Sequence, residues 1–323
     1  MVLKKYPYDD YGCAALRVID DTDCACEGDD PFAVAHLLIT SKFDVRAVTA
    51  ENYLHQADSA EKSYAAVGRL AEAMGLAGQV NILHGSLPMA DRDHYQTSEA
   101  SRFIVEEALR DDRRPLFVVC QGALTNLAVA LRECPEIAGR ITCIWIGGAP
   151  YPAGGWEFNL CNDITAARIV FESGMELWQV PANVYSMMRV SFMTLYKNLS
   201  RCGRAGRYLC EQLWSFNRKM CDYHDGKPSP FGGAARAAFV PSATGLTTFG
   251  CGECWQLGDS PVVGLMLNCQ PHDRDEIGAP AIADDGTYRL QPDNPRRIYV
   301  YRTIDAPFIL EDFFDKMAYQ FGE

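Results

Sequence analysis

Short apolar runs alternate with amphipathic segments through the first two-thirds of the chain, and this alternation restricts the possible folds more than any other feature. The runs Leu116–Cys120 and Ile141–Ile146 are apolar at nearly every position, which is typical of strands buried on both faces. Segments with helical spacing of apolar residues lie between such runs. In one of them, Ser59 is expected to cap the start of the helix and Gly75 to end it. The pattern predicts an α/β fold with an open, mostly parallel, doubly wound sheet and helices on both faces.

The rest of the chain is expected to belong to the same unit. No repeat, low-complexity tract or clear linker interrupts the sequence, so residues 1–323 are predicted to form a single domain. Residues 185–235 have a helical pattern rich in Lys and Arg and include a loop at 225–233, so we expect a lid there. Residues 286–321 are predicted to form a hairpin from 288–290 and 298–301, followed by a helix that Asp305 caps.

Charge and composition exclude several classes of partner. The chain carries 42 Asp and Glu residues against 30 Lys and Arg residues, a net charge of −12. Such a chain repels a phosphate backbone, so we expect no nucleic-acid partner and favour a cation or a neutral small molecule. The longest uncharged stretches near the middle, 116–131 and 141–156, are shorter than the roughly 20 apolar residues of a membrane helix. Without an apolar signal segment at the start, a cytoplasmic protein with reduced thiols at its 13 cysteines is expected.

The densest group of ionisable residues lies between Ile19 and Pro31, where five aspartates and Glu27 occur close together. The group follows an apolar strand and precedes a helix, and ligands of open parallel sheets bind at the carboxyl ends of the strands. Carboxylates this close repel one another unless a cation lies among them, so the segment predicts a metal site. The alternative is a solvated loop whose aspartates only cap the helix.

Polar side chains also follow the other predicted strands. Carboxylate and carbonyl oxygens at strand ends suit Ca²⁺ or Mg²⁺ better than Zn²⁺. Because no glycine-rich phosphate-binding loop accompanies them, the same groups suit a neutral polyol such as a sugar. The polar segments are 51–52, 84–85, 121–126, 156–159, Asn183 and 258–263.

The order of these segments resembles that of the inosine–uridine-preferring nucleoside hydrolases. The resemblance extends over about residues 17–265, and its most specific part combines the early acidic segment with Glu157, Asn159 and a late aspartate. The matching segments are Asp21-Thr22-Asp23, Asp29-Asp30, 48–52, 122–128, 146–149, Glu157-Phe158-Asn159, Asp163 and 257–262.

The resemblance implies a Ca²⁺-dependent N-ribohydrolase that cleaves the N-glycosidic bond of a ribonucleoside to ribose and free base, and that forms a homodimer or homotetramer. Asp23 would be the general base for the attacking water, and an anionic pocket would stabilise the oxocarbenium-like transition state. The implied Ca²⁺ ligands are Asp23, Asp30, Asp259 and the backbone carbonyl of Thr125. The residues implied to bind ribose hydroxyls are Asp29, Asn52, Glu157 and Asn159.

Two departures from the family concern the acidic segment and the late aspartate. Five residues separate Asp23 from Asp29 where three are usual, and the extra carboxylate of Glu27 is expected to cap the following helix. A place for Glu27 among the metal ligands is the alternative. Gly258 precedes Asp259 at a position where the family often has a histidine that can protonate the leaving base.

A third departure also affects the leaving-group half of the site. The stretch 151–156 lacks the asparagine that the family usually offers ahead of Glu157. Tyr151 and Trp156 are candidates for stacking on a sugar or base, although packing in a core is the commoner fate of such residues. The candidates for the missing acid are His94, Arg189, Tyr223 and His224.

Three alternatives remain open at this point. A hydrolase of another ribosylated compound, with a leaving group such as nicotinamide that departs without an acid, would need no side chain at Gly258. A non-catalytic nucleoside- or sugar-binding protein would keep the fold and the ion without turnover. A zinc site is the third alternative, with four candidate ligands in Cys24, Cys26, Cys251 and Cys254.

Overall fold

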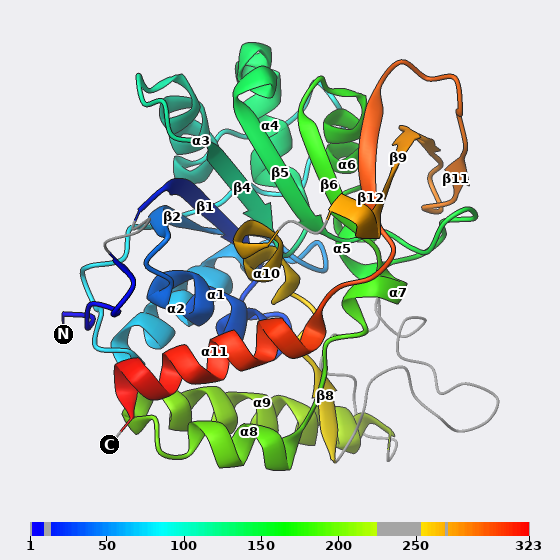
Figure 1. The fold of residues 1–323 in the computed structure, drawn as a ribbon. Helices are drawn as coiled ribbons and strands as arrows, with labels where there is room; N and C mark the ends of the chain where they lie inside the picture. Colours follow the sequence, from blue (N-terminus) through cyan, green and yellow to red (C-terminus); the bar gives the residue numbers. More distant parts are fainter. Residues whose placement is uncertain (1, 10–13, 225–252, 269–270, 323) are drawn as a thin grey trace.

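The centre of the structure is an eight-stranded sheet (Figure 1). The structure, a computed structural model, describes residues 2–9, 14–224, 253–268 and 271–322, with only the backbone for residues 221–224. The strands of the central sheet are β1 (Leu16–Thr22), β2 (Phe43–Ala50), β3 (Ile82–Leu83), β4 (Leu116–Cys120), β5 (Ile141–Ile146), β6 (Glu176–Val180), β9 (Arg274–Gly278) and β12 (Arg297–Tyr301). Their order is β3-β2-β1-β4-β5-β6-β12-β9, and every neighbouring pair is parallel except β12 with β9.

The sheet reverses its winding direction beside β1. From β1 the chain winds outward through β2 to β3, and then returns to β4 on the other side of β1 and continues to β6. The carboxyl ends of β1 and β4 therefore flank a topological switch point, the place where doubly wound sheets bind ligands. The acidic segment and Gln121 follow these two strands directly.

Helices cover both faces of the sheet, as predicted (Figure 1). The covering helices are α1 (Asp30–Ile39), α2 (Ser59–Ala73), α3 (Glu99–Leu109), α4 (Thr125–Glu133), α6 (Ile164–Glu172), α10 (Pro261–Leu267) and α11 (Ala306–Phe321). α3, α4 and α6 pack together on one face, and the other four helices pack on the opposite face. Within β4, Val118 and Val119 belong to different apolar clusters, one on each face. The α/β fold with a mostly parallel sheet is thus confirmed.

The helical region after β6 forms an outer layer. α7 (Ala182–Tyr185) follows β6, and α8 (Phe192–Leu199) and α9 (Gly203–His224) pack against α2 and α11 (Figure 1). A pair of short antiparallel strands, β7 (Arg189–Ser191) and β8 (Cys254–Gln256), was not expected from the sequence. The predicted loop at 225–233 lies outside the described residues. Within the described ranges, none of the helices combines the length and apolar character that a membrane crossing needs.

The predicted hairpin near the carboxyl terminus is wrong. β11 (Tyr288–Arg289) pairs with β10 (Ala281–Ile282), whereas β12 enters the central sheet between β6 and β9. Ile298, Val300 and Tyr301 of β12 are buried, and a strand with so much apolar surface buries it best inside a covered sheet. The last helix is confirmed as α11, because Asp305 Oδ1 accepts a hydrogen bond from the backbone N–H of Phe308 at 3.2 Å.

The two ends of α2 test the capping predictions made from the sequence. α2 begins at Ser59, and its N-cap residue is Asp58, so the predicted cap is displaced by one residue. Gly75 follows the C-cap Met74 with a φ of 71°, a left-handed conformation that favours glycine, and ends the helix as expected.

Candidate active site

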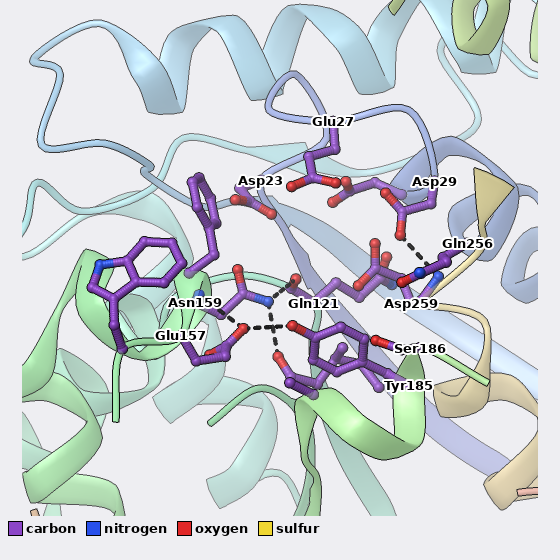
Figure 2. Close-up of a pocket in the computed structure, with 16 residues that line it drawn as sticks. Asp23, Glu27, Asp29, Gln121, Glu157, Asn159, Tyr185, Ser186, Gln256 and Asp259 are labelled. Atoms are coloured by element: carbon purple, nitrogen blue, oxygen red, sulfur yellow. Dashed lines mark hydrogen bonds between the residues drawn. The ribbon is translucent and has the colours of Figure 1, made fainter. Parts of the chain in front are cut away.

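A cavity of about 290 Å³ lies at the carboxyl ends of the central strands (Figure 2). Its volume is near the lower end of the range for small-molecule sites, roughly 300–1,000 Å³. Six of the described lining residues carry a carboxyl group, and none of them is histidine, lysine or arginine. The lining residues are Asp23, Glu27, Asp29, Asp30, Gln121, Ile146, Trp156, Glu157, Phe158, Asn159, Ala182, Tyr185, Ser186, Gln256, Gly258 and Asp259.

The acidic segment between β1 and α1 forms one wall of the cavity. Thr22, the last residue of β1, donates from Oγ1 to Asp30 Oδ1 at 2.6 Å. The backbone N–H of Gly258 donates to Asp29 Oδ2 at 2.9 Å, which ties the segment to the start of α10. Asp23 lies within hydrogen-bonding reach of Asp30. The local fold therefore gathers these carboxylates instead of separating them.

Three of the carboxyl groups have the spacing of a metal site. Asp29, Asp30 and Asp259 each place an oxygen within 4.8 Å of the other two, and all three residues are buried. Within the part of the chain that the structure describes, no other group of His, Cys, Asp or Glu residues has this spacing. A donor set made only of carboxylate oxygens fits a hard divalent cation such as Ca²⁺.

Burial strongly raises the pKa values of the carboxyl groups in the acidic wall. Loss of solvation raises the pKa of Asp29 to about 7 and that of Asp30 to about 6. The pKa values of Asp23, Glu27 and Asp259 are also raised well above the usual range, first by burial and then by the neighbouring negative charges. The group therefore holds protons, or it holds a cation that replaces them.

Glu27 lies in the cavity and not at the helix cap that we expected for it. The N-cap residue of α1 is Asp29, and its side chain makes no capping hydrogen bond. The longer loop instead carries the Glu27 carboxyl group toward Asp23 (Figure 2). Helix α9 supports this loop, because Gln212 Nε2 donates to the carbonyl of Gly28 at 2.7 Å. A Cβ atom at Gly28 would lie 2.6 Å from Leu213 Cδ1, so any other residue there would require the Leu213 side chain to move.

Glu157 stands on the opposite wall and is held by several donors. It is the N-cap of α5 (Phe158–Asn162), and its Oε2 accepts from the backbone N–H groups of Gly148 at 2.7 Å and Leu160 at 2.9 Å. Its Oε1 accepts from the Tyr185 hydroxyl at 2.9 Å. Burial raises the pKa of Glu157, and these hydrogen bonds oppose the rise by stabilising the ionised form.

Asn159 joins the ends of two strands beside Glu157. Its Nδ2 donates to the carbonyls of Gln121 and Ile146, both at 2.9 Å, so its amide oxygen is left for the cavity. Figure 2 shows that oxygen on the side of Asp23. The arrangement places a fixed acceptor opposite the acidic wall, which is suitable for a sugar hydroxyl.

The predicted site residues fall into two groups. Those that line the cavity are Asp23, Asp29, Asp30, Glu157, Asn159 and Asp259. Asn52 and Thr125 are not among the described lining residues and lie in a buried polar layer, where Asn52 Nδ2 donates to Thr125 Oγ1 at 2.9 Å. Thr125 Oγ1 donates in turn to Asp163 Oδ2 at 2.9 Å. Asn52 Oδ1 is buried and has no hydrogen-bond partner among the described residues.

Several cavity residues were missed by sequence reasoning. Tyr185, Ser186 and Gln256 line the cavity, but they lie on α7, just after it, and on β8, and no motif marks them. Gln121 was detectable, because it opens the polar segment that follows β4. Gly122 leaves room for the Asp23 carboxyl group, since a Cβ atom at position 122 would lie 2.9 Å from Asp23 Cγ.

The candidates that the sequence offered for the leaving-group half differ in whether they line the described cavity. Trp156 lines the cavity and is 49% exposed, so it is not a core residue. Tyr151 is not among the described lining residues, and its hydroxyl donates to Gln179 Oε1 at 2.9 Å. His94 is exposed and pairs with Asp91, and neither His94 nor Arg189 lines the described cavity. The side chains of Tyr223 and His224 lie outside the described residues.

The cysteine alternative is tested only in part. Cys24 and Cys26 are buried in the apolar cluster on the α1 side of the sheet. Cys254 is half-buried on β8, and Cys251 lies outside the described residues. The zinc site therefore stays an untested alternative.

Comparison with known proteins places the chain in a family. Residues 18–241 match the family described as inosine-uridine preferring nucleoside hydrolase. The pyrimidine-specific ribonucleoside hydrolase RihA of Salmonella newport (strain SL254) is 28% identical over 177 residues, 48% of this chain and 57% of that protein. This chain thus spans little more than half the length of that curated relative.

Two solved structures share the fold. The plant nucleoside hydrolase PpNRh1 has a TM-score of 0.70 at 18% identity, with 94% of this chain and 99% of that chain covered. The purine-preferring ribonucleoside hydrolase from Gardnerella vaginalis has a TM-score of 0.69 at 18% identity, with 94% and 98% covered. Because the family match extends over well more than half of the sequence, the chain belongs to the inosine-uridine preferring nucleoside hydrolase family.

Proposed function

We propose that the protein is a Ca²⁺-dependent N-ribohydrolase, which hydrolyses the N-glycosidic bond of a ribonucleoside to ribose and free base. The observation that carries this proposal is one cavity with a cluster of buried carboxylates on one wall and fixed hydrogen-bond acceptors on the other. Membership of the nucleoside hydrolase family supports it. The cytoplasmic location and the homodimer or homotetramer stay predictions from the sequence.

The metal would be held by the acidic wall. The proposed ligands are the buried Asp23, Asp30 and Asp259 and the backbone carbonyl of Thr125. Asp30 and Asp259 belong to the group of three aspartates with metal-site spacing, which supports a hard cation at this wall. When bound, Ca²⁺ supplies positive charge that lowers the pKa of a water molecule and orients the ribose hydroxyls.

The chain's own residues would bind the sugar and move the proton. Asp23 accepts the proton of the attacking water, and its burial in a negative environment makes it a strong acceptor when ionised. Asp29, Glu157 and Asn159 accept hydrogen bonds from ribose hydroxyls. The bonds that Glu157 already receives hold its carboxylate in one orientation, which reduces the cost of ordering it during the reaction. The negative walls stabilise the positive charge that develops on the sugar.

The direct test is the release of reducing sugar from a panel of ribonucleosides, with Ca²⁺ and again after chelation. Asp23→Asn keeps the size of the side chain and removes the base, so it should abolish turnover while the far-ultraviolet circular dichroism stays unchanged. Asp93→Asn is the matched control, because Asp93 is 77% exposed and forms a surface ion pair with Arg132 away from the cavity. Absence of release from a folded, Ca²⁺-loaded protein would contradict the proposal and favour a binding protein on a hydrolase fold.

A further inference from the structure

The charge of the cavity wall restricts which ribosides fit. Six of the sixteen described lining residues bear carboxyl groups, and none bears a positive charge. One divalent cation carries two positive charges, fewer than the number of carboxyl groups in this wall. A wall of this kind repels a substrate with a phosphate or carboxylate group and attracts a substrate with a positive charge.

Aromatic side chains supply a second reason to expect a cation. Trp156 is 49% exposed where it lines the cavity, and its ring packs edge-on against Phe158 with a centroid separation of 6.2 Å. Tyr185 also lines the cavity. Accessible faces of tryptophan and tyrosine are the surfaces that bind organic cations best, since the electron-rich ring attracts the charge.

The described part of the leaving-group side offers no obvious proton donor. Gly258 has no side chain, and the Tyr185 ring occupies the neighbouring space, with Cδ2 3.2 Å from the position of a Cβ atom at 258. The Tyr185 hydroxyl donates its hydrogen to Glu157 (Figure 2). Both Glu157 carboxyl oxygens already accept hydrogen bonds, Oε1 from Tyr185 and Oε2 from the backbone N–H groups of Gly148 and Leu160. The other carboxyl groups belong to the acidic wall where we place the cation.

We propose that the substrate class is a cationic riboside, in which ribose is joined to the positively charged nitrogen of an aromatic ring, as in nicotinamide riboside. This inference rests on the proposed N-ribohydrolase function and names its substrate. When the bond between C1′ and the ring nitrogen breaks, its electron pair passes to the nitrogen, and the leaving group departs as a neutral pyridine that needs no proton. The water oxygen bonds to C1′, and the proton it loses passes to Asp23 and then to solvent. One cation and one water thus give ribose, a pyridine and one proton.

The kinetic test compares nicotinamide riboside with uridine and inosine on the Ca²⁺-loaded protein. We expect kcat/KM for nicotinamide riboside to be higher by roughly 10²-fold or more, because a general acid typically contributes about 10²–10⁴-fold and the described residues of the leaving-group side offer none to a neutral base. Uridine or inosine hydrolysed at an equal kcat/KM, with sensitivity to chelation, would overturn the cationic substrate class and leave the N-ribohydrolase function intact.

The binding test separates charge recognition from turnover. By calorimetry, 1-methylnicotinamide, a cation, should bind the Ca²⁺-loaded protein more tightly than neutral nicotinamide, which has almost the same shape. Trp156→Leu should weaken binding of the cation several-fold, whereas the control Tyr196→Leu, at a residue that is 53% exposed on α8, should not. Equal affinity for the two pyridines would overturn the inference. Preferential binding of the cation without hydrolysis of any riboside would support the cation site and contradict the N-ribohydrolase function.

Discussion

Without the proposed Ca²⁺, the stability of the protein should fall as the pH rises from about 4 to about 8. Burial raises the pKa of Asp29 to about 7 from an ordinary value of 3.8, and the residue is buried in the folded chain. At pH values between 3.8 and about 7, Asp29 is ionised in the unfolded chain but still protonated in the folded chain. The stabilisation from the retained proton is therefore complete below about pH 4 and is lost as the pH passes through about 7.

The size of this effect follows from the shift. A difference of about three pKa units corresponds to about 4 kcal/mol, at about 1.36 kcal/mol per unit. The pKa of Asp30, raised to about 6, acts in the same direction. The two carboxyl groups repel each other, so their contributions do not add, and we expect a loss on the order of 4 kcal/mol.

Urea unfolding at about pH 5, 6.5 and 8, with chelator and with Ca²⁺, measures this loss. Ca²⁺ should oppose it, because the cation binds the ionised carboxylates of the folded chain and competes with their protons. Asp29→Asn removes one titrating group and keeps an oxygen that can accept the bond from the backbone of Gly258. In chelator the variant should have a flatter pH profile and be more stable than the wild type near pH 8.

A chelated wild type that is as stable at pH 8 as at pH 5 would refute this reasoning. So would an Asp29→Asn variant whose pH profile matches that of the wild type. Either result would mean that the carboxyl groups tolerate ionisation without a cation, and the argument for a metal site from their burial would fail.

Three further changes test single residues of the site. Asp259→Asn should lower Ca²⁺ affinity at least about tenfold, since it removes a charged ligand, and an unchanged affinity by calorimetry would exclude Asp259 as a ligand. Gly122→Ala should lower kcat by about 10²-fold, because the new Cβ would lie 2.9 Å from Asp23 Cγ and displace that carboxylate; unaltered kinetics would show that Asp23 is placed elsewhere in the complex. Asn159→Ala should raise KM and lower kcat through lost ribose contacts, whereas a change in melting temperature alone would indicate a purely structural residue.

Much of the fold was predictable because its strongest signals are local. β4 and β5 have the predicted bounds, since a run that is apolar on both sides of the chain can only be buried between two layers. The acidic segment marked one wall of the cavity for a similar reason, because carboxylates at the end of a buried strand need an unusual partner. The Asp305 cap was also predictable from a local signal, because its side chain accepts a hydrogen bond from a backbone N–H three residues further along the chain.

The amino-acid sequence by itself thus determined the layers of the fold and the acidic wall of the cavity. Only the tertiary structure decided that β12 joins the central sheet, that Glu27 turns into the cavity, and that Tyr185 fills the space beside Gly258. Each of these depends on contacts between segments far apart in the chain. Periodicity and capping report the preferences of neighbouring residues, whereas the free energy that places these side chains comes from long-range packing, and no short stretch of sequence contains it.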